Sequence, residues 1–129
     1  MGSIRSTFGR LHIPAAALLL SLGLPATALA HAELVSATPA AKSMAMPPLT
    51  ELRLKFSEGI EIKFTKVKVT GPGKKLIETG PAKLDPSDNT VLIVPLSAPL
   101  PDGKYTVDWQ AVSVDGHKTK GSYGFESMK

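Results

Sequence analysis

The chain has no cysteine. Disulfides are therefore excluded, as are thiolate sites for zinc or copper, and a metal site must use nitrogen, carboxylate oxygen or methionine sulfur. Histidine is scarce, with three residues in 129. No stretch repeats its apolar residues at helical spacing, and the 11 glycines and 11 prolines interrupt the chain throughout. No apolar run reaches the 18 or more residues of a typical transmembrane helix. These absences favour a small exported domain that is stabilised by its core.

The first residues have the three parts of a bacterial export signal. Arg5 and Arg10 make a positive start, the stretch 13–24 is apolar, and residues 28–30 read Ala-Leu-Ala. This small-x-small pattern marks a signal peptidase site. A membrane-spanning helix is the alternative, but the apolar run is too short for it. We therefore predict cleavage directly after the Ala-Leu-Ala motif.

Cleavage of the signal peptide 1–30 leaves residues 31–129, a length suited to one domain. The leader contains two of the 15 basic residues and none of the 11 acidic ones, so the mature net charge is +2. The remaining basic residues are scattered, which gives no support for nucleic-acid binding. The sequence thus predicts a soluble periplasmic protein with no membrane anchor after cleavage.

Short strands separated by turns dominate the mature chain. Strand patterns occur at 50–56, 64–70, 90–96, 104–112 and 121–125. The segment 104–112 alternates clearly, with Tyr105 and Trp109 on one side. The segment 90–96 is apolar throughout, which predicts burial on both faces. The segment 64–70 alternates less well, with Phe64 expected to face the core. Strands at this spacing predict a β-sandwich or barrel.

The mature chain has two histidines, His31 at its predicted first position and His117 near its end. A processed His31 would offer a free α-amine, which loses its proton readily, and an Nδ1 atom a few bonds away. These two atoms can chelate one ion, and His117 can add a third nitrogen. Tetragonal nitrogen and oxygen coordination suits Cu(II). The alternative is that His31 merely follows the cleavage site and has no role.

Two carboxylates, those of Asp115 and Glu58, are further candidate ligands. Asp115 precedes His117 by two residues, so both could reach one ion. The same residues also fit a turn in which Asp115 binds its own backbone and Gly116 adopts positive φ, and the two interpretations are compatible. Glu58 follows the strand 50–56 and could approach the site, although a solvated loop carboxylate is the ordinary outcome.

Three stretches together resemble the CopC family of periplasmic copper-binding proteins. They are HAELVSATPAAKS at the mature start, LRLKFSEGIE next, and YTVDWQAVSVDGHKTKGSYGF near the end. The resemblance extends over the whole mature chain. It implies a seven-stranded, Ig-like Greek-key β-sandwich or barrel that binds one Cu(II) ion per chain.

The resemblance also assigns ligands. It implies that His31 binds copper through amine and imidazole, an arrangement called a histidine brace. It makes His117 a further nitrogen ligand and Asp115 an oxygen ligand. It places Glu58 in an axial position or beside the ligands, where a carboxylate orients them. Trp109 is expected in the core, where bound Cu(II) should quench its fluorescence.

The chain departs from the branch of the family that holds Cu(I) in a methionine-rich loop. The corresponding stretch 69–85 has no methionine or histidine, and we interpret Met44 and Met46 as loop or core filler. A Cu(II)-only carrier or buffer in copper homeostasis, uptake or resistance is the leading prediction. We predict that the protein is a monomer and not an enzyme. The resemblance implies a CopD-type inner-membrane copper transporter as its partner. The alternatives are a histidine-brace copper oxidase or oxygenase and a metal-free Ig-like interaction module.

Overall fold

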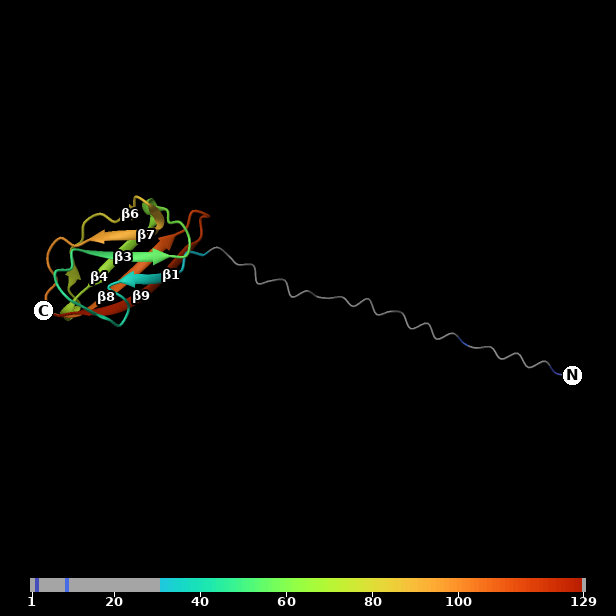
Figure 1. Ribbon diagram of the computed structural model, residues 1–129, viewed down its shortest axis with the longest axis horizontal. Helices are drawn as coiled ribbons and strands as arrows, with labels where there is room; N and C mark the ends of the chain where they lie inside the picture. The colour runs from blue at the N-terminus through green and yellow to red at the C-terminus, as the bar shows by residue number, and fades with distance from the viewer. Residues whose placement is uncertain (1, 3–8, 10–30, 129) are drawn as a thin grey trace.

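The structure is a computed structural model that describes residues 2, 9 and 31–128 (Figure 1). The predicted signal peptide 1–30 therefore lies outside the described residues except at Gly2 and Gly9, and its cleavage stays a prediction. Within the described part of the chain, no helix is long and apolar enough to cross a membrane.

The described residues form nine strands in two sheets and two short 3₁₀ helices. The four-stranded sheet has the order β1-β3-β7-β6, with bounds Leu34–Thr38, Glu51–Phe56, Asp88–Pro95 and Lys83–Asp85. The five-stranded sheet has the order β2-β9-β8-β4-β5, with bounds Met44–Ala45, Lys118–Ser127, Gly103–Val112, Lys66–Thr70 and Leu76–Ile77. The 3₁₀ helices η1 and η2 span Ile62–Phe64 and Pro72–Lys74.

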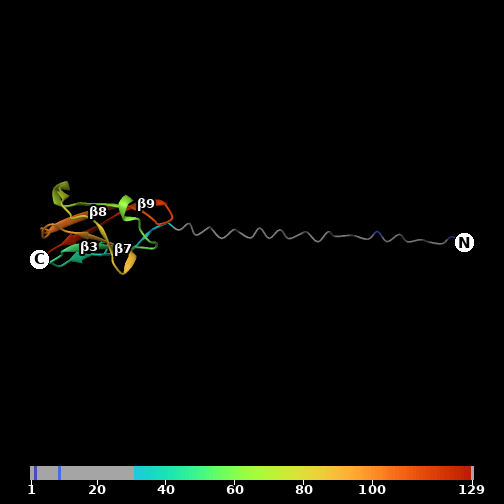
Figure 2. The same cartoon turned by 90° about the horizontal axis from the view of Figure 1, so that it is seen from above.

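The two sheets pack face to face, with β8 and β9 in one layer and β3 and β7 in the other (Figure 2). Alternate residues of β8 point into the space between the sheets, among them Tyr105, Val107 and Trp109, which are all buried. Leu52 and Leu54 of β3 meet them from the opposite layer as part of the same core cluster. The all-β sandwich predicted from the sequence is confirmed.

The expected seven strands correspond to the strands of three residues or longer in the described chain. The other two, β2 and β5, have two residues each and are defined by their neighbours β9 and β4. The predicted burial of 90–96 on both faces is borne out at Leu92, Ile93 and Val94 of β7. The prediction for Phe64 is wrong: the strand begins later, Phe64 ends η1, and its side chain is 60% exposed.

One long hairpin, formed by β8 and β9, brings the loop that carries His117 to one end of the sandwich. Strands β8 and β9 pair antiparallel over ten residue pairs, from Gly103 with Ser127 to Val112 with Lys118. The loop between them contains His117 and lies at the same end of the sandwich as His31. Residues from the beginning and the end of the domain thus meet at one pole.

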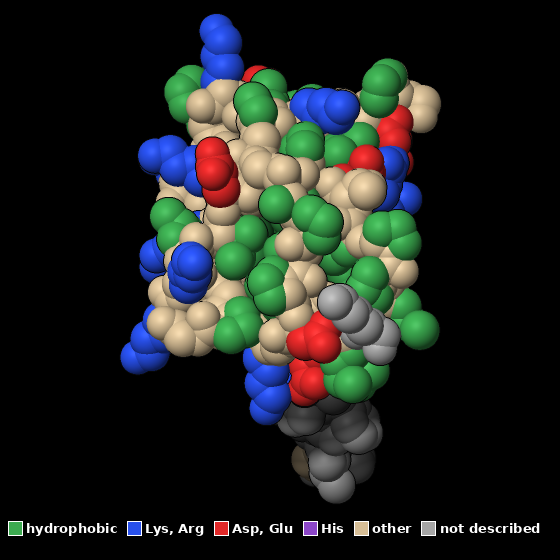
Figure 3. Space-filling view, turned by 90° about the vertical axis from the view of Figure 1, so that its left-hand side faces the viewer, with side chains coloured by type: hydrophobic (Ala, Val, Ile, Leu, Met, Phe, Trp, Pro, Cys, Tyr) green, Lys and Arg blue, Asp and Glu red, His purple; other side chains and the backbone are tan. Residues whose placement is uncertain are grey.

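The opposite pole, where β9 ends, carries mixed apolar and charged side chains (Figure 3). Met44 and Met46 are 56% and 77% exposed. Of the two interpretations, loop or core filler, the core alternative is therefore wrong. Met44 lies in the edge strand β2 with its side chain exposed, and Met46 lies in the loop that follows this strand.

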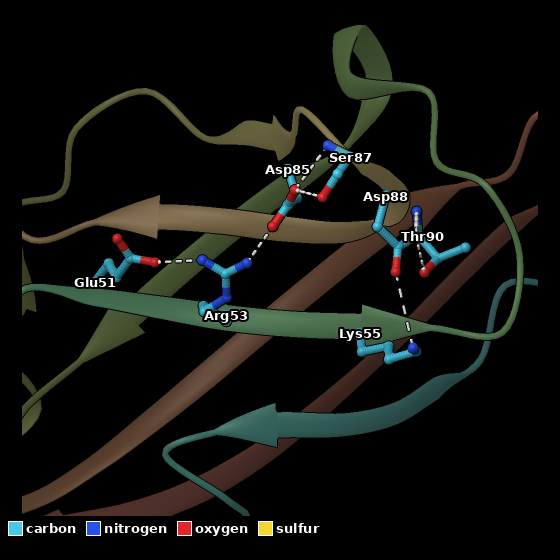
Figure 4. Close-up of polar contacts among 7 residues, drawn as sticks. All are labelled: Glu51, Arg53, Lys55, Asp85, Ser87, Asp88 and Thr90. Atoms are coloured by element: carbon cyan, nitrogen blue, oxygen red, sulfur yellow. Dashed lines mark hydrogen bonds and ion pairs between the residues drawn. The ribbon is translucent and has the colours of Figure 1, made fainter.

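An ion-pair network crosses the outer face of the four-stranded sheet (Figure 4). Arg53 of β3 contacts Glu51 at 3.0 Å and also forms an ion pair with Asp85. Asp85 accepts two hydrogen bonds of 2.8 Å from the backbone N–H and the hydroxyl of Ser87. These bonds, together with Arg53, hold the pKa of Asp85 below its usual value. The network ties β3 to the turn between β6 and β7.

Candidate metal centre

Hydroxyl groups from both sheets hold the backbone of residues 31–33. Ser57, directly after β3, donates its hydroxyl to the carbonyl of His31 at 3.0 Å and accepts the N–H of Glu33 at 3.0 Å. Thr119 of β9 donates its hydroxyl to the carbonyl of Ala32 at 2.6 Å. Ala32 is fully buried and belongs to the core cluster. The backbone around His31 is thus fixed from both sheets.

The loop that carries His117 is a tight turn. The hydroxyl of Ser113 and the backbone N–H of His117 both donate to Oδ1 of Asp115, the latter at 3.2 Å. Gly116 has a φ of 89° and donates its N–H to the carbonyl of Ser113 at 2.8 Å. The turn interpretation of this sequence is therefore confirmed, and glycine is the residue that adopts such a φ without strain.

The structure brings His31 and His117 together. Their ring centroids are 4.9 Å apart, and the planes are nearly perpendicular at 86°. Nδ1 of His117 lies 3.0 Å from Oδ2 of Asp115. A histidine that gives one ring nitrogen to a carboxylate keeps the other for a metal, and the carboxylate orients the ring. Three of the four predicted site residues therefore form one connected group.

Two electrostatic features suit a cation at this place. The hydrogen bond from Ser113, together with that from the side chain of His117, lowers the pKa of Asp115 to about 2. Asp115 is therefore an anion at neutral pH. Nδ1 of His31 is buried and has no hydrogen-bond partner among the described residues. A buried nitrogen without a partner is costly, and a metal ion would satisfy it.

The group is nevertheless not a finished coordination sphere. Among residues 31–128, no set of three or more histidine, aspartate or glutamate side chains converges closely enough to hold a metal. Asp115 accepts the hydrogen bonds of its own turn on Oδ1 and contacts Nδ1 of His117 through Oδ2, so a metal would bind the remaining lone pairs of these oxygens. Glu58 is half-buried in the bend after β3, and its role as a ligand stays a prediction.

Sequence reasoning missed Ser57, Ser113 and Thr119, which fix the backbone around the two histidines. Ser57 directly precedes Glu58 in the Phe-Ser-Glu stretch 56–58, which is part of LRLKFSEGIE. Hydroxyl residues are common in loops and strands, so only the tertiary contacts distinguish these three from other serines and threonines.

Comparison with known proteins gives one consistent answer. Residues 34–127 match the CopC domain. This match includes Glu58, Asp115 and His117 and begins just after His31. The chain is 50% identical over 96 residues to Protein YobA of Escherichia coli strain K12, covering 74% of this chain and 77% of YobA. It is 38% identical over 112 residues to Copper resistance protein C of Escherichia coli, covering 82% and 88% of the two chains.

A solved structure agrees with the sequence matches. The crystal structure of PcoC, a methionine-rich copper resistance protein from Escherichia coli, superimposes with a TM-score of 0.70 at 34% identity. The superposition covers 77% of this chain and 100% of PcoC. The present chain has only four methionines in 129 residues.

Proposed function

The chain belongs to the CopC family, and from this premise we propose that it is a periplasmic protein that binds one Cu(II) ion as its cargo. It acts in copper homeostasis, uptake or resistance as a carrier or buffer rather than as an enzyme. The observation that carries this proposal is the contact between His31 and His117, whose rings lie 4.9 Å apart with Asp115 bonded to the second ring.

The donor set favours Cu(II) over other ions. With the signal peptide removed, His31 offers its α-amine and Nδ1, and His117 offers a ring nitrogen. Three nitrogens and a carboxylate oxygen suit the tetragonal geometry of Cu(II), which also binds most tightly among the divalent first-row metals. The described chain has no cysteine, and its exposed Met44 and Met46 have no histidine beside them in sequence, which argues against a Cu(I) centre of the thioether type.

Signal-peptide cleavage is part of this proposal because it creates a ligand. Before cleavage, residue 31 has an amide nitrogen, which is a poor donor at neutral pH, and offers one imidazole. After cleavage, the same residue is a two-nitrogen chelate. Export and copper competence therefore arise together, and a CopD-type transporter in the inner membrane is the partner that we propose for the released ion.

The test compares two forms of the exported protein, one that begins at His31 and one that retains Ala30. Each is titrated with Cu(II) against a competing chelator, with Trp109 fluorescence and electron paramagnetic resonance as readouts. We expect the additional residue to abolish the tight site. A third form, with one residue added at the C-terminus, controls for chain length. Equal affinity in all three forms would contradict the brace.

His117→Ala is the second arm of the test. We expect much weaker binding and a resonance spectrum with fewer coupled nitrogens, because one equatorial imidazole is lost. Lys118→Ala changes the adjacent exposed residue and should bind copper normally. Wild-type affinity in the His117 variant would remove this residue from the centre.

A further inference from the structure

We propose that Ser57 and Thr119 are positioning residues for the metal centre: their hydroxyls hold the carbonyls of His31 and Ala32, so that the His31 ring stays against His117 before copper arrives. This inference rests on the proposed function as far as copper is concerned. It also makes a claim about the metal-free protein, which can be tested separately.

The chain start needs such support because the sheet ends before it. The first residue pair of β1 with β3 is Leu34 with Phe56, so residues 31–33 lie beyond the strand. The register then shifts between Leu34 and Ser36, which leaves Val35 as an extra residue in β1. Bulges of this kind bend the strand and redirect its end. Unsupported residues beyond a strand end fray readily.

Ser57 supplies the support from the four-stranded sheet. Its hydroxyl donates to the carbonyl of His31 and accepts the N–H of Glu33, both at 3.0 Å. Its backbone N–H donates to the carbonyl of Glu33 at 2.8 Å. The hydroxyl thus bridges the two residues that flank Ala32 and continues the pairing of β1 with β3 by side-chain bonds. Alanine at position 57 would keep only the backbone bond.

Thr119 supplies the support from the five-stranded sheet. Its hydroxyl bonds to the carbonyl of Ala32 at 2.6 Å, across 87 positions of sequence. Thr119 pairs with Ala111 in the hairpin and lies two residues after His117. The bond therefore connects the backbone beside His31 directly to the segment that carries His117. The contact between the two rings is thus supported by a bond to the backbone that involves neither ring.

This arrangement gives Ser57 and Glu58 different roles in the Phe-Ser-Glu stretch. Ser57 contacts the backbone of residues 31–33, whereas Glu58 is predicted to be an axial ligand or to lie beside the ligands. Groups that orient metal ligands typically change affinity by about 10- to 100-fold when they are removed. The loss arises because copper must then order three residues that the wild-type protein has ordered already.

The experiment uses the protein that begins at His31 with four single variants. Ser57→Ala and Thr119→Val remove the hydroxyls, the second with little change of shape. Ser57→Thr restores a hydroxyl at the exposed position 57. Ser43→Ala is the matched control, because Ser43 also donates its hydroxyl to a backbone carbonyl, that of Ala40 at 2.6 Å, at an exposed site outside the centre.

Each variant is measured twice, without copper by hydrogen exchange and with copper by affinity and resonance spectrum. In the metal-free protein, amide hydrogen exchange at Glu33 should become about 5-fold faster in Ser57→Ala, the factor expected for one hydrogen bond of ordinary strength. With copper, affinity should fall by about 10-fold in Ser57→Ala and in Thr119→Val. The resonance spectrum should broaden as the histidine geometry becomes heterogeneous. Ser57→Thr and Ser43→Ala should match wild type in both measurements.

The outcomes separate this inference from the proposed function. Wild-type exchange at Glu33 in Ser57→Ala overturns the positioning role, whatever the copper data show. Tight copper binding by wild type with equal affinity in both hydroxyl-deletion variants overturns it too, while the copper function stands. Faster exchange in a protein whose wild type binds no copper would retain the backbone clamp and reject the copper function instead.

Discussion

Gly121 is opposite Trp109 in the hairpin of β8 and β9, and its lack of a side chain is required by the indole ring. A Cβ atom at position 121 would lie 2.5 Å from Cζ2 and 2.8 Å from Cε2 of Trp109. The ring also packs edge-on against Phe56, with centroids 5.1 Å apart and planes at 74°, so a shift of the indole would disturb this contact. Both aromatic residues are buried. Gly121→Ala must therefore displace the ring or separate the strands.

Two opposing effects set the size of the loss. Overpacking a well-packed core costs typically about 1–3 kcal/mol. Replacing glycine by alanine also restricts the unfolded chain, which stabilises by about 0.4–1 kcal/mol where the backbone permits it. The clash is the larger effect, so we expect a net loss of about 1–2 kcal/mol in the free energy of unfolding. For a domain of this size the melting temperature should fall by roughly 4–16 °C.

Urea denaturation followed by far-ultraviolet circular dichroism measures the change, with Ser122→Ala as the control because Ser122 is exposed on the neighbouring position. The same substitution is then made in a Trp109→Phe background, where the smaller ring leaves space for the new methyl group. In that background Gly121→Ala should lower the free energy of unfolding by much less, so the double variant should be more stable than the sum of the two single losses predicts. An equal cost in both backgrounds would refute the steric explanation.

Three further substitutions test polar groups elsewhere in the fold. Tyr105→Phe removes a hydroxyl that donates to the carbonyl of Pro101 and should lower the free energy of unfolding by about 1 kcal/mol in urea denaturation. Tyr123→Phe removes a buried hydroxyl without a partner among the described residues, so the same measurement should show equal or higher stability. The pKa of Asp85 is lowered chiefly by Ser87, so its contribution is present above the unfolded value of about 3.9 and is lost as the pH falls through the folded value. Asp85→Asn should therefore flatten the rise of the urea midpoint with pH at acidic pH.

The strands with strong alternation could be predicted from sequence. Strand β8 shows why: Tyr105, Val107 and Trp109 face the core, and the polar residues between them face outward. The apolar run of β7 and the turn at Gly116 can be predicted from sequence equally well. In each case local pattern and tertiary environment agree.

The short strands could not be predicted. Strands β2 and β5 have two residues each and owe their conformation to β9 and β4. Phe64 misled the prediction because aromatic residues favour strands, although Phe64 is out of phase with the alternation of Val67 and Val69, and the backbone there forms η1. Tertiary context overrides propensity in both cases.

The histidines of the candidate centre could be found from sequence, but their surroundings could not. His31 and His117 stood out because the chain has so few histidines. The proximity of their rings and the hydroxyl bonds from Ser57 and Thr119 depend on contacts between distant parts of the chain. No local pattern encodes such contacts.

The hydrogen bond between Thr119 and Ala32 spans 87 positions of sequence. The candidate centre therefore joins the first and last parts of the domain. Contacts of such separation carry a large loop-closure cost and wait for the intervening strands to assemble. On the proposed function, an unfolded or truncated chain would keep the chelate of a processed His31 but would lose the ligands that folding brings to it. Tight metal capture would then require completed folding. An ion bound there would oppose unfolding by linking the two ends of the fold, so copper supply would lengthen the time for which the folded protein resists proteases.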